Sequence, residues 1–214
     1  MTAIAFESIP IQETNEPVVD LSDYDFILAP MYFTQELSSS PQMFLRKSVA
    51  DKLLHIQKQL TYQFKIWDGF RSRAVQNNIY KKFWKELHKN HPDWDEKKLA
   101  QEVAVFVTNA SDPSRIPPHA TGGAVDLTLV YRNGNELNMG TGFDYFGKEA
   151  ASLYFEEHDL DDQVKANRKL LRESMIAAGF RSDNDEWWHF DYGNQIWALH
   201  YHKPFAIYAE VANG

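Results

Sequence analysis

The chain contains no cysteine among its 214 residues. This absence excludes disulfides, thiolate nucleophiles and cysteine-type zinc fingers, so any bound metal must rely on histidine and carboxylate ligands. The sequence also lacks an apolar run approaching the roughly 18 residues that a membrane-spanning helix requires. The first 17 residues contain three glutamates, no basic residue and no apolar stretch suited to a signal peptide. These absences predict a cytoplasmic protein without a membrane partner.

Basic residues are fewer than acidic residues. The chain has 22 Lys and Arg against 30 Asp and Glu, which gives a formal net charge of −8. A negative field repels phosphate backbones, and no dense Lys/Arg run offsets it, so we expect no nucleic-acid partner. With 43% hydrophobic and 24% charged residues, the composition is that of a globular protein. Its 14% aromatic content supplies large side chains for a core or a shaped pocket.

Apolar residues recur at helical spacing in several segments. Ser40 before Pro41 is a typical helix start. Asp93 with Glu96 resembles an N-terminal capping pair, and glycine after a helix favours a left-handed stop. The predicted helices cover 41–60, a segment from Arg73 onward, a segment after His91-Pro92 that contains Leu99, Val103 and Phe106, and 161–178 before Gly179.

Short β-prone runs lie between these helices. Strands are predicted at 62–67 and 124–130, with a hairpin turn at 133–135 and a return strand at 136–139. The breaker-rich stretch 109–123 is predicted as a loop, and two or three aromatic-rich strands should finish the chain. No linker or repeat divides the sequence. We therefore expect an α+β fold with a central antiparallel sheet flanked by helices, forming one domain over 1–214 with an extended N-terminal segment over 1–20.

The first chemically suggestive motif joins His119 to Asp126 through two glycines. Asp126 falls inside an apolar strand, where an unpaired carboxylate is costly unless it binds a cation. The glycines let the backbone bend so that the loop histidine approaches the same point. An alternative is that Asp126 accepts hydrogen bonds in a turn while His119 is merely exposed. The motif alone does not decide between the two.

The second motif is Glu186-Trp187-Trp188-His189. A catalytic zinc needs three protein ligands, an open position and a nearby base. In a regular strand a spacing of three places Glu186 and His189 on opposite sides, so a bulge or a strand end is required for them to act together. The alternative is an amphipathic strand whose tryptophans fill the core while the polar residues face water.

The third motif is Asp68-Gly69-Phe70-Arg71 at a strand-to-helix junction. Arg71 there offers a fixed cation for a substrate carboxylate or for the oxyanion that develops when water attacks an amide. A salt bridge between Arg71 and Asp68 is the structural alternative. The histidines outside these motifs lack partners at ligand spacing and are interpreted as surface or packing residues, although His200 and His202 could approach the site.

In this order, the motifs resemble the D-alanyl-D-alanine dipeptidases, which are zinc peptidases within the wider group of D,D-carboxypeptidases and Hedgehog-like domains. The resemblance covers most of the chain. Its segments are Asp68-Gly69-Phe70-Arg71, His119 to Asp126 continuing into Leu127-Thr128-Leu129, Met139-Gly140-Thr141 with Phe143-Asp144, Asn167-Arg168 with Leu170-Leu171, and Gly179-Phe180 before Glu186-Trp187-Trp188-His189.

The resemblance implies one Zn²⁺ per chain, bound by His119, Asp126 and His189. It further implies that Glu186 is the general base and that Arg71 stabilises the tetrahedral intermediate. The implied reaction is hydrolysis of the small dipeptide D-alanyl-D-alanine to free D-alanine, within cell-wall metabolism. A dipeptide has a free ammonium group, for which Asp144 is the candidate partner and a turn residue is the alternative interpretation.

One departure from the wider family is visible. Pro117, followed by Pro118, occupies the position where a serine usually precedes the first histidine ligand. Proline lacks both the hydroxyl and the N–H. Two other functions remain open at this point: a cell-wall carboxypeptidase or endopeptidase with the same zinc chemistry, and a non-catalytic zinc-stabilised binding domain, for which a base beside the metal has no use.

Overall fold

The structure is a computed structural model that describes residues 5–106, 112, 114–145 and 147–212. Short 3₁₀ helices are labelled η. The elements in chain order are η1 (Phe6–Ser8), β1 (Val18–Asp20), η2 (Leu21–Asp23), β2 (Ile27–Leu28), α1 (Met31–Thr34), β3 (Phe44–Arg46), α2 (Lys47–Gln59), β4 (Gln63–Asp68), α3 (Arg73–Asn90), α4 (Glu96–Phe106), η3 (Pro118–Thr121), β5 (Ala124–Val130), η4 (Lys148–Ala150), α5 (Tyr154–Glu157), α6 (Asp162–Ala177), β6 (Arg181–Ser182), β7 (His189–Asp191) and α7 (Gln195–His200).

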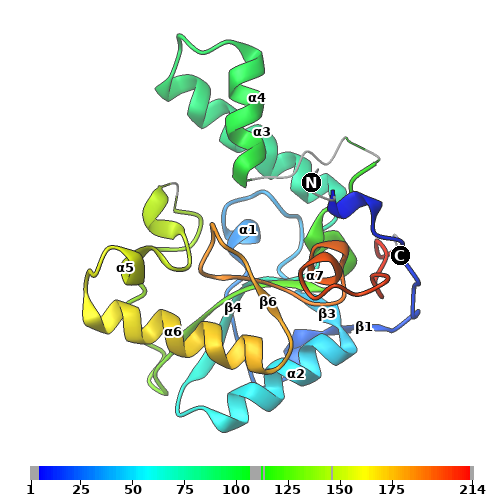
Figure 1. The fold of residues 1–214 in the computed structure, drawn as a ribbon, viewed down its shortest axis with the longest axis vertical. Helices are drawn as coiled ribbons and strands as arrows, with labels where there is room; N and C mark the ends of the chain where they lie inside the picture. Colours follow the sequence, from blue (N-terminus) through cyan, green and yellow to red (C-terminus); the bar gives the residue numbers. More distant parts are fainter. Residues whose placement is uncertain (1–4, 107–111, 113, 146, 213–214) are drawn as a thin grey trace.

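A five-stranded sheet with the order β2-β4-β5-β7-β6 forms the centre of the fold (Figure 1). The pairs β4–β5, β5–β7 and β6–β7 are antiparallel, whereas the two-residue edge strand β2 runs parallel to β4. A separate antiparallel pair joins β1 to β3. The expected α+β fold with a central sheet is confirmed, and the sheet is antiparallel in every pair except the one at the β2 edge.

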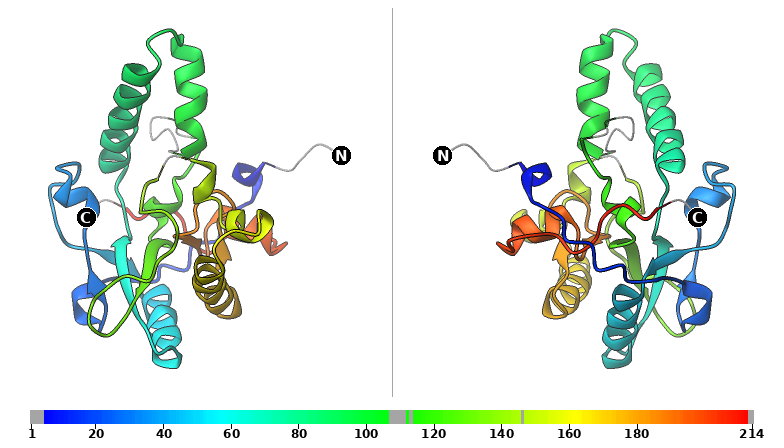
Figure 2. Two further views of the ribbon diagram at one scale, coloured as in Figure 1. Left: turned by 90° about the vertical axis from the view of Figure 1, so that its left-hand side faces the viewer. Right: turned by 90° about the vertical axis from the view of Figure 1, so that its right-hand side faces the viewer.

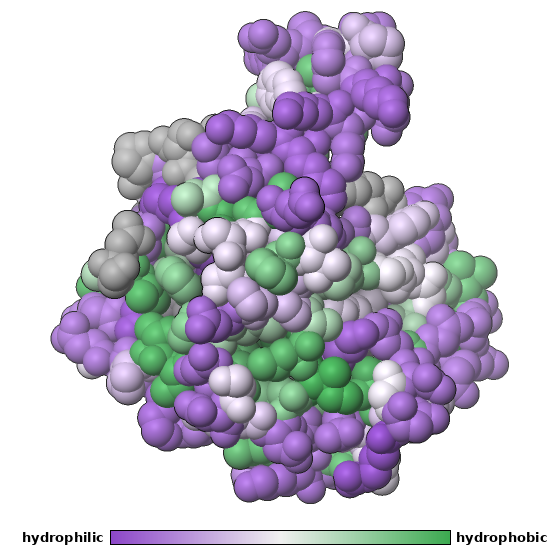
Figure 3. Space-filling model, turned by 180° about the vertical axis from the view of Figure 1, so that it is seen from behind, coloured by the Kyte–Doolittle hydropathy of each residue, from purple (hydrophilic) through white to green (hydrophobic). Residues whose placement is uncertain are grey.

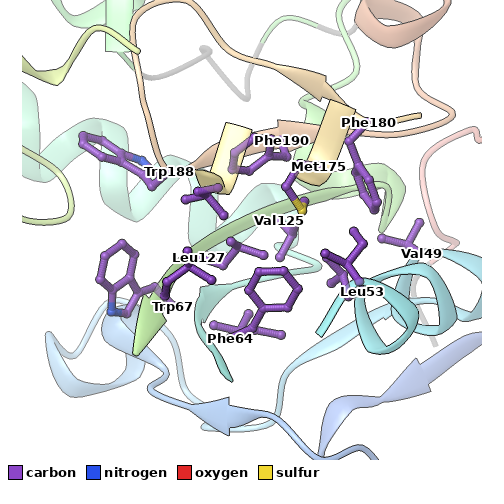
Figure 4. Packing of buried hydrophobic residues seen from close by; sticks show 14 of the residues in the cluster. Val49, Leu53, Phe64, Trp67, Val125, Leu127, Met175, Phe180, Trp188 and Phe190 are labelled. Atoms are coloured by element: carbon purple, nitrogen blue, oxygen red, sulfur yellow. The ribbon is translucent and has the colours of Figure 1, made fainter. Parts of the chain in front are cut away.

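The principal core lies between this sheet and two helices. Val125 and Leu127 of β5 belong to one buried cluster with Leu53 of α2 and Met175 of α6 (Figure 4). Successive residues of a strand point to opposite faces, so Asp126, between those two apolar residues, points away from this core. The helices therefore cover one face of the sheet, and the polar chemistry of β5 lies on the other.

The helix predicted over 41–60 begins later, at Lys47. Phe44–Arg46 form β3 instead, paired with Val18–Asp20. Leu45 is completely buried in the core and the Arg46 guanidinium donates to Thr121 O, so tertiary contacts hold this segment extended. Within its described part, the N-terminal segment expected to be extended contains a 3₁₀ turn and strand β1.

Three other expectations also need correction. The cap of α4 is Asp95, whose carboxylate accepts from Lys98 N at 2.7 Å, and not Asp93. The return strand at 136–139 is reduced to one bridge between Val130 and Glu136 plus a hydrogen bond from Leu137 N, because the chain then turns toward α6. Two of the aromatic-rich strands expected at the end of the chain are present as β6 and β7, but helix α7, begun by a cap at Asn194, and the segment 201–212 follow them.

The helices α3 and α4 form a hairpin that projects from the body of the molecule (Figures 1 and 2). Ile79 and Phe83 of α3 pack with Val103 of α4 and with Tyr32. The outer surface of the projection is largely hydrophilic in the view of Figure 3. Within the described residues, no helix combines the length and the apolar character needed to cross a bilayer.

Arg168 of α6 fastens the long segment between β5 and α6. Its side chain is buried and donates to the carbonyl oxygens of Met139 at 2.7 Å, Ala151 at 2.8 Å and Glu149 at 2.9 Å. It also lies 3.3 Å from Thr141 Oγ1. Buried carbonyls need donors, so one guanidinium fixes the path of a segment that has little regular secondary structure.

Replacing Arg168 with Met (R168M) should lower the free energy of unfolding by about 3 kcal/mol, because several enclosed carbonyls lose their donor. Urea denaturation followed by circular dichroism measures the change. The matched control is K169M on the exposed side of the same helix, where the ion pair with Glu173 is well solvated and removal costs less than about 1 kcal/mol. If the two substitutions lower the free energy of unfolding equally, Arg168 does not hold this segment in place.

Candidate active site

The register of three neighbouring strands builds the floor of the site. Asp68 at the end of β4 lies opposite Asp126 of β5, and Asp126 lies opposite His189 of β7. Residues directly opposite each other in adjacent strands point to the same face. All three side chains are buried, on the face of the sheet away from α2 and α6. Strand pairing thus brings together groups that are far apart in the chain.

His119 reaches the same point from η3. Gly122 ends this turn with a φ of 69°, and a Cβ on Gly123 would lie 2.3 Å from Tyr192 O, so the backbone here needs both glycines. The bend foreseen from the sequence is present. His119 Nε2 lies 3.2 Å from the Nδ1 atom of His189 and 3.4 Å from Asp126 Oδ2.

The outer nitrogen of each imidazole is held by a fixed acceptor. His119 Nδ1 donates to the carbonyl oxygen of Gly69 at 2.8 Å, and His189 Nε2 lies 3.2 Å from Asp191 Oδ1. A carbonyl oxygen can only accept, so neutral His119 carries its proton on Nδ1 and its lone pair on Nε2. His189 lies between two carboxylates, because its Nδ1 atom is also 2.9 Å from Asp126 Oδ1. Burial would lower the pKa of His189, but Asp191 and Asp126 raise it well above its ordinary value. When His189 is neutral with its proton on Nε2, toward Asp191, its lone pair is on Nδ1, the atom that faces His119.

When both imidazoles are neutral, two lone pairs and the Asp126 carboxylate therefore converge. One ligand atom from each of His119, Asp126 and His189 can be chosen so that all lie within 4.8 Å of one another. Burial alone would raise the pKa of Asp126, but the two imidazoles lower it below its ordinary value. A divalent cation satisfies all three groups at once, and imidazole nitrogen with carboxylate oxygen is a donor set that zinc accepts. The residues present fit a metal ion.

Asp191 was missed from the sequence. It is completely buried, and it accepts from Arg181 Nη1 at 2.7 Å and from Asn194 Nδ2 at 2.6 Å. Burial would raise its pKa, but His189 and Arg181 lower it below the usual range, so Asp191 is an ionised acceptor for His189. A signal was available: positions 189 and 191 share one face of a strand because side chains alternate with period two.

Arg71 makes the salt bridge considered for it and also lines the cavity of the site. Its Nε lies 3.1 Å from Asp68 Oδ2, so the structural salt bridge exists. Its Cζ lies 5.0 Å from the centre of the Tyr32 ring, and the side chain lines the same cavity as Glu186. Burial raises the pKa of Asp68 to about 6, against the opposing charges of Arg71 and His119. The arginine is held rigidly at the edge of the site.

Glu186 lies in the turn before β7, and the strand begins at His189. The strand end required for these residues to act together is therefore present. Burial raises the pKa of Glu186 to about 8. A cation bound beside it would oppose this shift, because a nearby positive charge favours the carboxylate. Glu186, Arg71, His119 and His189 all line a cavity of about 220 Å³, open to solvent.

Asp144 lies near the site, but it is not one of the described residues that line this cavity. Its Oδ1 accepts from the Tyr32 hydroxyl at 3.2 Å, and its buried Oδ2 has no hydrogen-bond partner in the part of the chain that the structure describes. Burial, with the nearby Asp126 charge, raises the pKa of Asp144 to about 7. His200 and His202 are exposed and do not belong to the metal-ligating group.

Comparisons with known proteins agree on one family. The model of the M15 peptidases, described as D-Ala-D-Ala dipeptidase, matches residues 31–210. A D-alanyl-D-alanine dipeptidase of Synechocystis is 26% identical, with 95% of each chain covered. The D-alanyl-D-alanine dipeptidase of Escherichia coli is 37% identical over 65% of this chain and 60% of its own length.

Two solved structures are similar in fold. The first is the LdcB LD-carboxypeptidase, with a TM-score of 0.45 and 17% sequence identity, covering 89% of this chain and 76% of that chain. The second is the vancomycin resistance D,D-pentapeptidase VanY, with a TM-score of 0.42 and 14% sequence identity, covering 94% of this chain and 96% of that chain. The family match spans every residue of the site described above, from Asp68 to Asp191. The chain therefore belongs to the M15 peptidase family of D-Ala-D-Ala dipeptidases.

Proposed function

We propose that this protein hydrolyses D-alanyl-D-alanine to free D-alanine, with one zinc ion held by His119, Asp126 and His189. The observation that carries the proposal is the buried convergence of two imidazole nitrogens and one carboxylate, each imidazole being held through its other ring nitrogen. Membership of the peptidase family supports the reaction class. When bound, zinc acts as a Lewis acid that polarises a carbonyl and lowers the pKa of water.

Glu186 is the proposed general base. Its carboxylate accepts a proton from the attacking water and then donates that proton to the leaving amine, so one residue serves both proton transfers. The carboxyl lies in the wall of the same cavity as the histidines. The enclosed setting that raises its pKa also makes it a competent proton donor in the second step.

Arg71 is the proposed electrostatic stabiliser. Its guanidinium is fixed before the reaction by Asp68 and by the Tyr32 ring, so no reorganisation is needed when negative charge develops on the scissile carbonyl oxygen. Such a preorganised donor contributes typically about 3 to 4 kcal/mol to transition-state stabilisation. Asp144 remains the candidate partner for the substrate ammonium, supported by its unpartnered Oδ2.

Incubation of the zinc-loaded protein with three substrates tests the proposal. Free alanine should appear with D-Ala-D-Ala and be at least tenfold less with L-Ala-L-Ala or with a pentapeptide ending in D-Ala-D-Ala. Release from the pentapeptide at the higher rate would instead identify a carboxypeptidase. No release from any of the three, with zinc bound, would favour a non-catalytic binding domain.

Replacing Glu186 with Gln (E186Q) should lower kcat by about 10²- to 10⁴-fold, because the base is lost while the shape of the side chain is kept. Zinc content, measured by atomic absorption after dialysis, should stay at the wild-type level because Glu186 is not among the three ligands. The control is E173Q on the exposed side of α6. Wild-type turnover in E186Q would remove Glu186 from the mechanism.

Asp191 should strengthen metal binding through His189. Replacing it with Asn (D191N) removes the negative charge behind the imidazole and should weaken zinc affinity about 10- to 100-fold. Competition with a chromophoric chelator measures this affinity without reference to turnover. The control is D185N, since Asp185 is exposed. Unchanged affinity in D191N would contradict an orienting role for Asp191.

A further inference from the structure

Arg115 is the second arginine in the wall of the cavity that contains Glu186. Its side chain is 38% exposed, so its charge is available to a ligand that enters from solvent. The side chain of Arg71, the other arginine of that wall, is only 9% exposed. The cavity therefore contains one enclosed guanidinium and one that can meet an incoming anion.

The N-terminal turn η1 holds Arg115 in place. Glu7 Oε1 lies 2.6 Å from Arg115 Nε, and the Arg115 Cζ lies 5.0 Å from the centre of the Phe6 ring. The turn is itself anchored, because Gln195 Nε2 of α7 donates to Ile9 O at 2.7 Å. The Glu7 carboxylate at the edge of the planar guanidinium and the Phe6 ring against its face thus orient the Arg115 side chain.

The Nη atoms of Arg115 remain available. Across 5–106, 112, 114–145 and 147–212, neither Nη atom donates a hydrogen bond to another described residue. A guanidinium edge with two parallel N–H groups matches the two oxygens of a carboxylate. We propose that Arg115 binds the terminal carboxylate of the substrate and so selects peptides with a free C-terminus; this assignment rests on the proposed dipeptidase function.

The neighbouring backbone explains why a side chain is needed for this task. Pro117 and Pro118 lie between Arg115 and His119, and neither proline has an N–H to offer an anion. A carboxylate that enters the cavity gives up part of its hydration, which is costly unless a donor replaces the lost water. Arg115 supplies both the charge and the donors at the point where the loop supplies neither.

The test compares D-Ala-D-Ala with D-alanyl-D-alaninamide, which lacks the carboxylate charge. The wild type should have a KM for the acid about 10- to 100-fold below that for the amide, which is the size expected for a charge-assisted pair. Replacing Arg115 with Met (R115M) should raise the KM of the acid by that factor, leave kcat within about threefold, and remove the preference. E7Q should give a smaller rise, because Arg115 keeps its charge and loses its support.

R132M is the matched control, since Arg132 lies in an exposed turn outside the cavity, and it should behave as wild type. Calorimetric titration of both ligands into E186Q and into E186Q with R115M gives the same comparison without turnover. If E186Q binds the acid and R115M keeps the full preference over the amide, the assignment of Arg115 is wrong while the dipeptidase function stands. If the wild type neither binds nor cleaves D-Ala-D-Ala, the proposed function fails first and Arg115 loses its role with it.

Discussion

The structure depends on an electrostatic conflict at the centre of its sheet. Two imidazoles each turn one ring nitrogen toward the other and toward the Asp126 carboxylate, in a place that solvent hardly reaches. Gly69 O and Asp191 hold the opposite ring nitrogens, so neither imidazole can relieve the conflict by rotating. A fully buried arrangement of this kind is favourable only with positive charge at its centre, from a bound cation or from a proton on His189. The fold thus maintains the proposed cation site through contacts outside it.

The surrounding polar network makes this arrangement stable. A salt bridge to Arg181 compensates the charge of Asp191, and a salt bridge to Arg71 compensates that of Asp68. Arg168 secures the segment that carries Thr141 and Asp144, and Trp187 Nε1 donates to the Thr141 hydroxyl at 2.8 Å. Segments that are separate in the sequence are therefore held by two groups of hydrogen bonds, one around the site and one around Arg168.

Local sequence patterns predicted much of this fold. Strand β5 begins and ends where its apolar run does, α6 ends before Gly179 in the left-handed region, and the two glycines after His119 do permit the bend. The start of α2 was wrong because Phe44–Arg46 pair with β1, and helical periodicity carries no information about a distant partner strand. The same limit applies to the site, because the register that places Asp68 beside Asp126 is a property of the folded sheet. Arg115 gave no local signal, since its significance comes from the cavity that it lines.

The residues of the site have two kinds of support. Asp68, Asp126, His189 and Asp191 belong to strands of the central sheet, whereas Glu186 and Arg115 lie on connecting segments above it. Substitutions in those segments can alter which peptide is accepted while the sheet keeps the spacing of the strand-borne groups. His119 is the exception among the proposed ligands, because η3 carries it close to Arg115 in the chain. The protein is accordingly a suitable scaffold for redesign, in which new specificities can be introduced on the connecting segments while the strand-borne residues of the proposed metal site stay in place.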